Sequence, residues 1–268
     1  MVRVVKSRDY KVGGINVRET TAVGTSRGVP VLLVHGGLHG SWCWDAYVDF
    51  LTGRGWDCHV LDWRGRGLSD PLDESEAIGR SLEDVAVDIE LVAQGLAAPP
   101  LVVAHSMGAL ATLKFAETNR YRGLALLTPV LPDEVSPASI SLPIDPTSLW
   151  GPPPFESAQA LFFSGTDEPD ARRYYGMLVP ESPKAVAQAT TDPRVSIDKS
   201  RITGPGLVVG AEHDLLTPHA EVRELAALLG MKFYDASGFG HGITLDRSWE
   251  KIATVVHEWL ADQVPGNG

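Results

Sequence analysis

Six short apolar runs, separated by segments with helical spacing, constrain the fold of this chain more than any other feature. The runs lie at residues 31–34, 58–61, 101–104, 124–127, 207–209 and 232–234. Each is nearly continuous in apolar character, as expected of a strand that is covered on both faces. Alternation with helical segments is typical of strand-helix units in a mostly parallel sheet, so all six runs are predicted to be central strands.

The segments between and after these runs carry helix signals. Apolar residues recur at helical spacing in 82–96, 109–118, 220–229 and 249–260. Ser81, with Asp84 three residues later, predicts a helix start, and Gly230 predicts a helix end. Stretches 2–5 and 15–23 alternate or carry glycine and charge, which predicts an antiparallel hairpin at the edge of the sheet.

One region interrupts the alternation. Between residues 129 and 193 the chain has 12 of its 19 prolines. Proline breaks long helices and is excluded from central strands, so residues 131–200 are predicted to form an inserted lid of short helices and loops. Residues 1–130 and 201–268 would then form the core.

Aromatic side chains of the lid have two interpretations. They either cover an apolar pocket or pack the small core of the lid itself. We select Trp150 and Phe155 from the lid, together with Leu38 from the core, as candidates for substrate contact.

The segment LVVAHSMGAL at 101–110 predicts a nucleophile. An apolar strand runs into AHSMG and then into a helix, and a sharp strand-to-helix turn exposes a serine hydroxyl to a neighbouring base. Ala104 and Gly108 are small, as required where backbone passes close to backbone, although Ala104 occupies a position where glycine is usual. Ser106 is therefore predicted to be the nucleophile, and the alternative is a tight turn with an inert serine.

Two backbone N–H groups are predicted to stabilise negative charge on a substrate oxygen. The N–H of Met107 lies at the start of the helix after Ser106. The second candidate is Gly37 in VLLVHGGLHGSW at 31–42, because glycine lets the backbone turn its N–H into a site. His35 is interpreted as a structural residue bonded to nearby backbone, and His39 as a packing or pocket-side residue.

A base and an acid complete the constellation. Asp214 follows the run 207–209 in GAEHDLLTP, so its carboxylate is expected at the same sheet edge as Ser106. His241 lies in the glycine-rich segment SGFGHGIT, whose backbone lets the ring reach the serine. The chain order serine, acid, histidine is one of the known orders of such catalytic triads. We therefore predict His241 as the general base and Asp214 as the residue that orients it.

Other acids and one other histidine compete for these roles. Glu212 is close in sequence, and Asp133 follows the preceding strand. Asp62 is interpreted as structural because Arg64 and the glycines of DWRGRGLSD suggest a salt-bridged turn. His213 is geometrically awkward as a base because it adjoins the acid.

Charge and cysteine content exclude some classes of partner. The formal net charge is −11, so the chain would be repelled by nucleic acid and by anionic membrane surfaces. Cys43 and Cys58 are too few for a disulfide framework and are expected to be reduced and packed. The first residues lack a signal-peptide pattern and no apolar stretch reaches about 18 residues. We expect a soluble cytoplasmic protein without a membrane partner, and the sequence does not indicate an oligomeric state.

Five blocks in order resemble the α/β-hydrolase superfamily over nearly the whole chain. They are HGG with a following Trp42, DxRGxGxSD at 62–70, AHSMG at 104–108, GxxHDxxxP at 210–218 and GFGH at 238–241. The resemblance implies an α/β-hydrolase fold with a mostly parallel eight-stranded sheet, helices on both faces and a small inserted lid. It also implies a serine hydrolase that cleaves a small-molecule acyl compound, either an ester, a lactone or a thioester, with no metal and no organic cofactor.

Three alternatives stay open at this stage. HGGLHGSWCW is similar to the corresponding stretch of plant methylesterases and of hydroxynitrile lyases, so a lyase is one alternative. A cofactor-free oxygenase on the same triad is another, and a small-molecule receptor that keeps the fold is the third. The lyases, as the resemblance implies, have threonine and lysine where this chain has Gly36 and Gly242. Serine at position 106 argues against the dehalogenases and epoxide hydrolases of this fold, which use aspartate.

Overall fold

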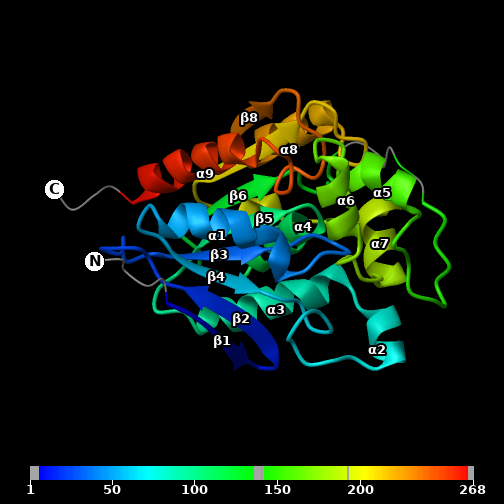
Figure 1. Ribbon diagram of the computed structural model, residues 1–268, viewed down its shortest axis with the longest axis horizontal. Coiled ribbons are helices and arrows are strands. Elements are labelled where there is room, and N and C mark those ends of the chain that lie inside the picture. The colour runs from blue at the N-terminus through cyan, green and yellow to red at the C-terminus, as the bar shows by residue number, and fades with distance from the viewer. Residues whose placement is uncertain (1–5, 136–139, 141, 192, 265–268) are drawn as a thin grey trace.

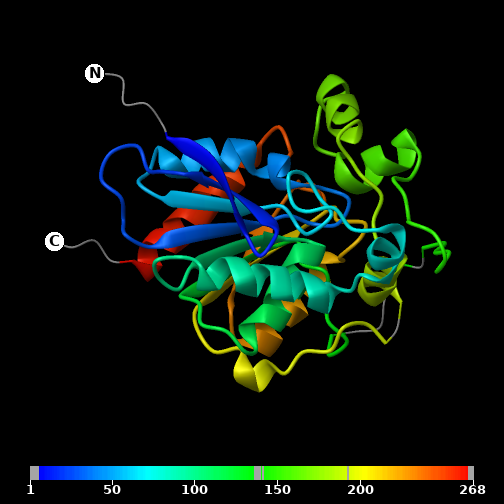
Figure 2. The same cartoon turned by 90° about the horizontal axis from the view of Figure 1, so that it is seen from below.

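A single mostly parallel sheet, with helices on both faces, forms the centre of the molecule (Figures 1 and 2). The computed structural model describes residues 6–135, 140, 142–191 and 193–264. The strands are β1 (Ser7–Val12), β2 (Ile15–Thr20), β3 (Pro30–Val34), β4 (Asp57–Leu61), β5 (Leu101–His105), β6 (Gly123–Leu127), β7 (Gly206–Ala211) and β8 (Lys232–Ala236). Their order is β1-β2-β4-β3-β5-β6-β7-β8, which confirms the predicted eight-stranded α/β sheet.

The predicted apolar runs are strands, but one of them is not central. β3 to β7 lie inside the sheet, whereas β8 is at its edge and pairs in parallel with β7. The sequence of β8 is KFYDA, and Lys232 and Asp235 are exposed. The prediction of a central strand at 232–234 was therefore wrong, because Lys232 and the adjoining Asp235 are charged residues that border solvent.

The opposite edge of the sheet is an antiparallel hairpin, as predicted. β1 and β2 pair through a turn in which Gly13 and Gly14 have φ angles of 55° and 86°. Such angles favour glycine. The stretch 2–5, which was predicted as one strand of this hairpin, lies outside the described residues, and the observed first strand follows it in sequence.

The pleat of the central strands divides the core into two layers. In β5, Leu101 and Val103 point into one cluster of buried side chains, whereas Val102 and Ala104 point into the other. Figure 2 shows the helices that cover these two faces. One face has α1 (Asp45–Thr52) and α9 (Trp249–Gln263), and the other has α3 (Leu82–Gln94), α4 (Met107–Ala116) and α8 (His219–Leu229). Each large side chain buried here stabilises the fold by about 1.5–3 kcal/mol.

The helix signals of the sequence are confirmed at two termini. The Ser81 side chain accepts a hydrogen bond from the Asp84 N–H while the Asp84 side chain accepts from the Ser81 N–H, so α3 begins with a capping box. Gly230 adopts a left-handed conformation at the end of α8. Cys43 and Cys58 are free and buried, as expected.

Between β6 and β7 the chain leaves the sheet. Its helices there are α5 (Phe155–Phe162), α6 (Glu168–Tyr175), α7 (Pro183–Thr190) and the short η2 (Lys199–Arg201). Figure 1 shows α5, α6 and α7 gathered at one end of the sheet. The division into a core and a lid at 131–200 stays a prediction. In the described part of the chain, no helix has the length and apolar character that a membrane span needs.

Candidate active site

Ser106 occupies a strained turn between β5 and α4. Its φ and ψ angles are 53° and −124°, which is uncommon for a residue other than glycine and costs about 1–3 kcal/mol. The turn is held from the end of β6: the Ser106 N–H donates to the Leu127 carbonyl, and the Ser106 carbonyl accepts from the Val130 N–H, both at 3.1 Å. The surrounding backbone therefore fixes the serine at the start of the helix.

Small residues are required around this turn because two backbone segments meet there. A Cβ atom added to Gly108 would lie 2.1 Å from the His35 carbonyl oxygen, and one added to Gly36 would lie 2.9 Å from Ser106 Cβ. The loop after β3 thus packs directly against the first turn of α4. Ala104 is fully buried in β5, so the methyl group at this position is accommodated in the core.

The three residues predicted as a triad form one hydrogen-bonded chain. His241 Nδ1 lies 2.8 Å from Asp214 Oδ2, and His241 Nε2 lies 2.8 Å from Ser106 Oγ. A carboxylate only accepts, so Nδ1 carries the proton and Nε2 accepts from the serine hydroxyl. The side chains of His241 and Asp214 are 1% and 0% exposed. This geometry is that of a serine prepared for nucleophilic attack.

The carboxylate of Asp214 is also held by its own loop. Oδ1 accepts from the N–H groups of Leu216 and Thr217 at 2.8 and 2.9 Å, and Oδ2 accepts from Thr217 Oγ1 at 2.7 Å. Burial acts to raise the pKa of Asp214, but attraction to His241 and the hydrogen bonds from His241 and Thr217 outweigh it, so the pKa is lowered. The group therefore stays ionised at neutral pH.

His241 is positioned by two residues that were not predicted from the sequence. The backbone carbonyl of His241 accepts from His105 Nε2 at 3.0 Å and from Thr128 Oγ1 at 3.1 Å. Burial, followed by the charge of His241, holds the pKa of His105 well below its ordinary value, so the ring is neutral. His105 adjoins the serine in AHSMG, which was an available signal, whereas Thr128 follows β6 without any motif.

The competing acids and the competing histidine are placed elsewhere. The Glu212 carboxylate is half-exposed and accepts from the Gly238 N–H, and the Asp133 carboxylate accepts from the backbone N–H of Arg194. The side chain of His213 is 65% exposed. The site thus brings Asp214 to His241, and places Glu212, Asp133 and His213 outside the hydrogen-bonded chain.

Asp62 is structural, as expected, but for a different reason. Its carboxylate accepts from the backbone N–H groups of Ser41 and Leu68 at 2.7 and 3.5 Å. The Arg64 guanidinium donates to the carbonyl of Gly13. The turn does have ion pairs, such as that of Arg66 with Glu181, but backbone amides and not Arg64 satisfy this aspartate.

The loop after β3 carries the predicted charge-stabilising donor Gly37. A Cβ atom at Gly37 would lie 2.3 Å from Met107 Sδ, so the loop and the start of α4 face each other across the site. His35 Nδ1 donates to the Gly36 carbonyl at 2.8 Å and its Nε2 accepts from the Trp63 N–H at 3.2 Å. His35 thus bonds nearby backbone, as interpreted from the sequence.

His39 packs beneath the same loop. Its Nδ1 donates to the Gly37 carbonyl at 2.8 Å, and its ring stacks on Trp42 with centroids 5.3 Å apart. Burial lowers the pKa of both His35 and His39 to about 4. Both rings are therefore neutral at pH 7 and act as fixed hydrogen-bond donors to the loop.

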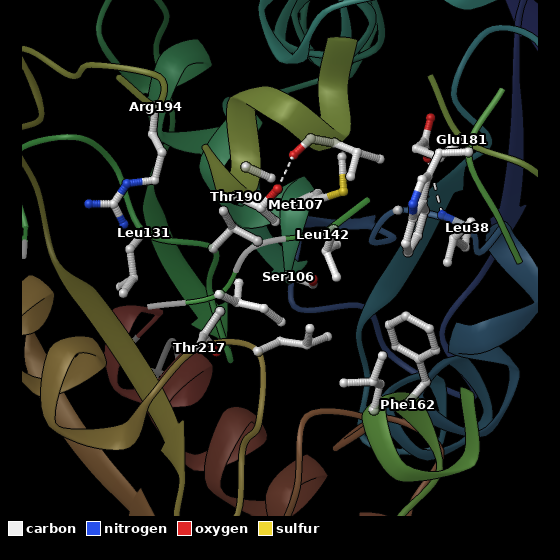
Figure 3. A pocket seen from close by; sticks show the side chains of 18 residues that line it. Leu38, Ser106, Met107, Leu131, Leu142, Phe162, Glu181, Thr190, Arg194 and Thr217 are labelled. Atoms are coloured by element: carbon white, nitrogen blue, oxygen red, sulfur yellow. Dashed lines mark hydrogen bonds between the residues drawn. The ribbon is translucent and has the colours of Figure 1, made fainter. Parts of the chain in front are cut away.

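A cavity of about 70 Å³ lies against Ser106 (Figure 3). Gly37 and Met107 line it beside the serine, and most of its remaining surface comes from apolar side chains such as Leu131, Leu142 and Phe162. Leu38 and Trp150 line it as predicted. An apolar cavity beside this serine is suited to an apolar part of a ligand.

Phe155 does not belong to the described residues that line this cavity. Its ring packs edge-to-face on Tyr175 at 5.4 Å between centroids, and the Arg172 guanidinium lies 4.2 Å from its centre. The structure therefore favours packing over substrate contact for Phe155, because its side chain lies between α5 and α6.

This difference between two aromatic residues gives a direct test. Trp150→Ala is expected to shift the preference among acyl chain lengths by about tenfold in kcat/KM, because it removes part of the cavity wall. Phe155→Ala is the matched control and should keep the wild-type preference. The comparison uses p-nitrophenyl esters of increasing chain length, and an unchanged preference in Trp150→Ala would remove this residue from the substrate site.

In the parts of the chain that the structure describes, no group of three or more histidine, cysteine, aspartate or glutamate side chains is arranged to hold a metal ion.

Comparison with known proteins places this geometry in a family context. A family model described as "Alpha/beta hydrolase family" matches residues 31–255. Methylesterase 9 of Arabidopsis thaliana is 30% identical over 112 residues, which are 40% of this chain and 43% of the plant protein. The match therefore spans less than half the length of that relative.

Solved structures share the fold at low sequence identity. The enol-lactonase of Burkholderia xenovorans has a TM-score of 0.72 at 16% identity, and the match covers 95% of this chain and 100% of the lactonase. An esterase of Exiguobacterium antarcticum has a TM-score of 0.69 at 19% identity, with 92% and 95% covered. The monoacylglycerol lipase of Paleococcus ferrophilus has a TM-score of 0.66 at 22% identity, with 92% and 99% covered.

Proposed function

Because this chain belongs to the α/β-hydrolase family, we propose that it is a serine hydrolase that cleaves a carboxylic ester, or a related lactone or thioester, through an acyl-enzyme. The observation that carries the proposal is the hydrogen-bonded chain from Asp214 through His241 to Ser106 beside an apolar cavity. The fold relatives, which include a lactonase, an esterase and a lipase, support acyl chemistry.

In the first half of the reaction, Ser106 Oγ attacks the carbonyl carbon of the substrate while its proton passes to His241 Nε2. Asp214 stabilises the resulting imidazolium. The negative oxygen of the tetrahedral intermediate accepts hydrogen bonds from the N–H groups of Gly37 and Met107. When the intermediate collapses, the bond to the leaving group breaks and His241 returns the proton to it, which leaves an acyl group on the serine.

In the second half, water replaces the leaving group. His241 takes a proton from the water, whose oxygen attacks the acyl carbon, and the same two N–H groups stabilise the second tetrahedral intermediate. Its collapse breaks the bond to Ser106 Oγ, which recovers its proton from His241. The carboxylic acid product then leaves the cavity.

Two glycines favour hydrolysis over cyanohydrin cleavage. A lyase stabilises departing cyanide, and a lysine after the histidine would do so by charge attraction. A Cβ atom at Gly242 would lie 1.7 Å from the Phe162 carbonyl oxygen, so a larger residue requires the backbone to move. A Cβ atom at Gly36 would lie 3.0 Å from His105 Nδ1 as well as close to Ser106, so a threonine would crowd the nucleophile.

The proposal is tested by assaying an aryl acetate and mandelonitrile side by side. We expect turnover of the ester and no cyanide release above the uncatalysed rate. Lactone and thioester panels then identify the acyl compound that is cleaved fastest. Cyanide release without ester turnover would assign a lyase, and saturable binding without any turnover would assign a receptor, and either result would overturn the proposal.

A further inference from the structure

The loop that carries Gly37 is fixed at each of its peptide groups. His35 donates to the Gly36 carbonyl and His39 donates to the Gly37 carbonyl, both at 2.8 Å. The next N–H, that of Leu38, is bonded to the Glu181 carboxylate, with 3.1 Å between Leu38 N and Glu181 Oε2. Figure 3 shows this hydrogen bond at one side of the cavity, opposite Arg194. A glutamate from a distant part of the chain thus holds the peptide group directly after Gly37.

Glu181 is a buried charge with a complete set of partners. Its side chain is 3% exposed, and its Oε1 accepts from Arg66 Nη2 at 2.6 Å and from the Ser182 N–H at 2.9 Å. Arg66 is 10% exposed and also donates to the Pro180 carbonyl at 2.6 Å. Replacing a buried ion pair of this kind by apolar residues of similar size often leaves the stability of a protein unchanged. We therefore expect this pair to have a role other than stability.

The backbone around Glu181 adds to the same contact. The Val179 N–H donates to the Leu38 carbonyl at 3.0 Å, so Leu38 is bonded on both sides by the segment 179–181. Glu181 and Trp150 exchange two backbone hydrogen bonds at 2.8 and 2.9 Å. The φ angle of Leu38 is 64°, a strained value that persists only where the surroundings hold it.

From these contacts we propose that Glu181, with Arg66 as its counter-ion, is a positioning residue for the N–H of Gly37. This inference rests on the proposed hydrolase function. Donors to the reacting oxygen act within a narrow range of about 2.7–3.1 Å. Without an acceptor for its N–H, the strained Leu38 relaxes, the peptide group turns and the adjoining Gly37 N–H leaves that range. The residues at 179–181 thereby act on a donor that lies in the loop after β3.

The test removes the acceptor without leaving a buried charge. The double variant Glu181→Leu/Arg66→Met replaces the ion pair by apolar groups of similar size, a change that proteins often tolerate. Glu181→Gln keeps an oxygen that can accept from Leu38. The matched control is Asp88→Leu/Arg80→Met, because Asp88 is likewise a buried carboxylate paired with one arginine, and it accepts from the backbone N–H of Arg64.

Each variant is assayed with an ester and with its thionoester, whose sulfur is a poor hydrogen-bond acceptor. We expect the double variant at 181 and 66 to lose about 10–100-fold in kcat, with KM changed less than about threefold. Its preference for the ester over the thionoester should fall, since that preference comes from hydrogen bonds to the carbonyl oxygen. Glu181→Gln and the control at 88 and 80 should stay within about fivefold of the wild-type kcat.

The outcomes separate positioning from packing and from substrate contact. Wild-type kcat in the double variant, an effect confined to KM, or an unchanged ester-to-thionoester preference would each overturn the inference. If the double variant does not fold, the second apolar pair Glu181→Met/Arg66→Leu is read by the same criteria. Wild-type protein that turns over neither compound contradicts the proposed function itself, whereas active wild type with insensitive variants contradicts only the role of Glu181.

Discussion

Ser106→Ala is expected to lower ester hydrolysis by about 10⁴–10⁶-fold in kcat while the protein stays folded. The variant loses the oxygen that forms the acyl-enzyme, so only substrate binding and the N–H groups of Gly37 and Met107 remain. Hydrolysis must then proceed by direct attack of water on the substrate, because His241 no longer has a serine hydroxyl to activate. The measurements are steady-state rates with an aryl ester and the thermal unfolding midpoint.

A fluorophosphonate probe gives the second readout. It should label the wild type at Ser106, and Ser106→Ala should resist labelling. Ser164→Ala is the control, because this serine is exposed and lies outside the hydrogen-bonded chain. If the alanine variant at 106 retains the wild-type rate, or if the wild type resists the probe, Ser106 is not the nucleophile.

Asp214→Asn is expected to lower kcat by about 10⁴-fold. The side-chain amide keeps the shape of the carboxylate and can still accept from Leu216 and Thr217, so the fold should be preserved. Its NH₂ group, however, can donate to His241 Nδ1 and thereby favour the tautomer that carries the proton on Nε2. That tautomer cannot accept the proton of Ser106. The imidazolium formed during attack also loses its negative partner.

The controls for this prediction are the two acids that compete in sequence. Glu212→Gln and Asp133→Asn should stay within about threefold of the wild-type kcat, because neither carboxylate contacts His241. Each variant is compared at several pH values, since a change of tautomer should lower kcat at every pH and not only shift the profile. A loss at Asp133→Asn equal to that at Asp214→Asn would move the orienting acid to the end of β6.

The three residues of the hydrogen-bonded chain could be predicted to lie together because each follows a predicted strand within a short motif. Ser106 follows an apolar strand and precedes a helix, and Asp214 and His241 follow later strands in motifs of their own. In a parallel sheet the ends of such strands meet at one edge, so the sequence order was enough to bring them together. His213 was judged awkward from its position beside the acid, whereas only the structure separates Glu212 from the hydrogen-bonded chain.

Contacts that depend on how the segment between β6 and β7 folds could not be predicted in this way. Glu181 is 143 residues from Leu38 in sequence, and no motif joins them. Trp150 and Phe155 are both aromatic residues near prolines, but only the folded positions of α5 and α6 determine that Phe155 packs on Tyr175 while Trp150 reaches the cavity. Lys232 and Asp235 of β8 could likewise be assigned to a sheet edge only once the strand order was known.

The backbone pairing of Trp150 with Glu181 has a consequence for engineering. Both hydrogen bonds use main-chain atoms, so exchanging the indole keeps them and removes only its own hydrogen bond to the Pro143 carbonyl. A saturation library at position 150 would therefore vary the cavity wall without disturbing the residues that perform the chemistry. Proline is the one substitution to leave out, because it has no N–H to donate to the Glu181 carbonyl. Position 150 is thus a favourable starting point for redirecting the enzyme toward bulkier acyl groups.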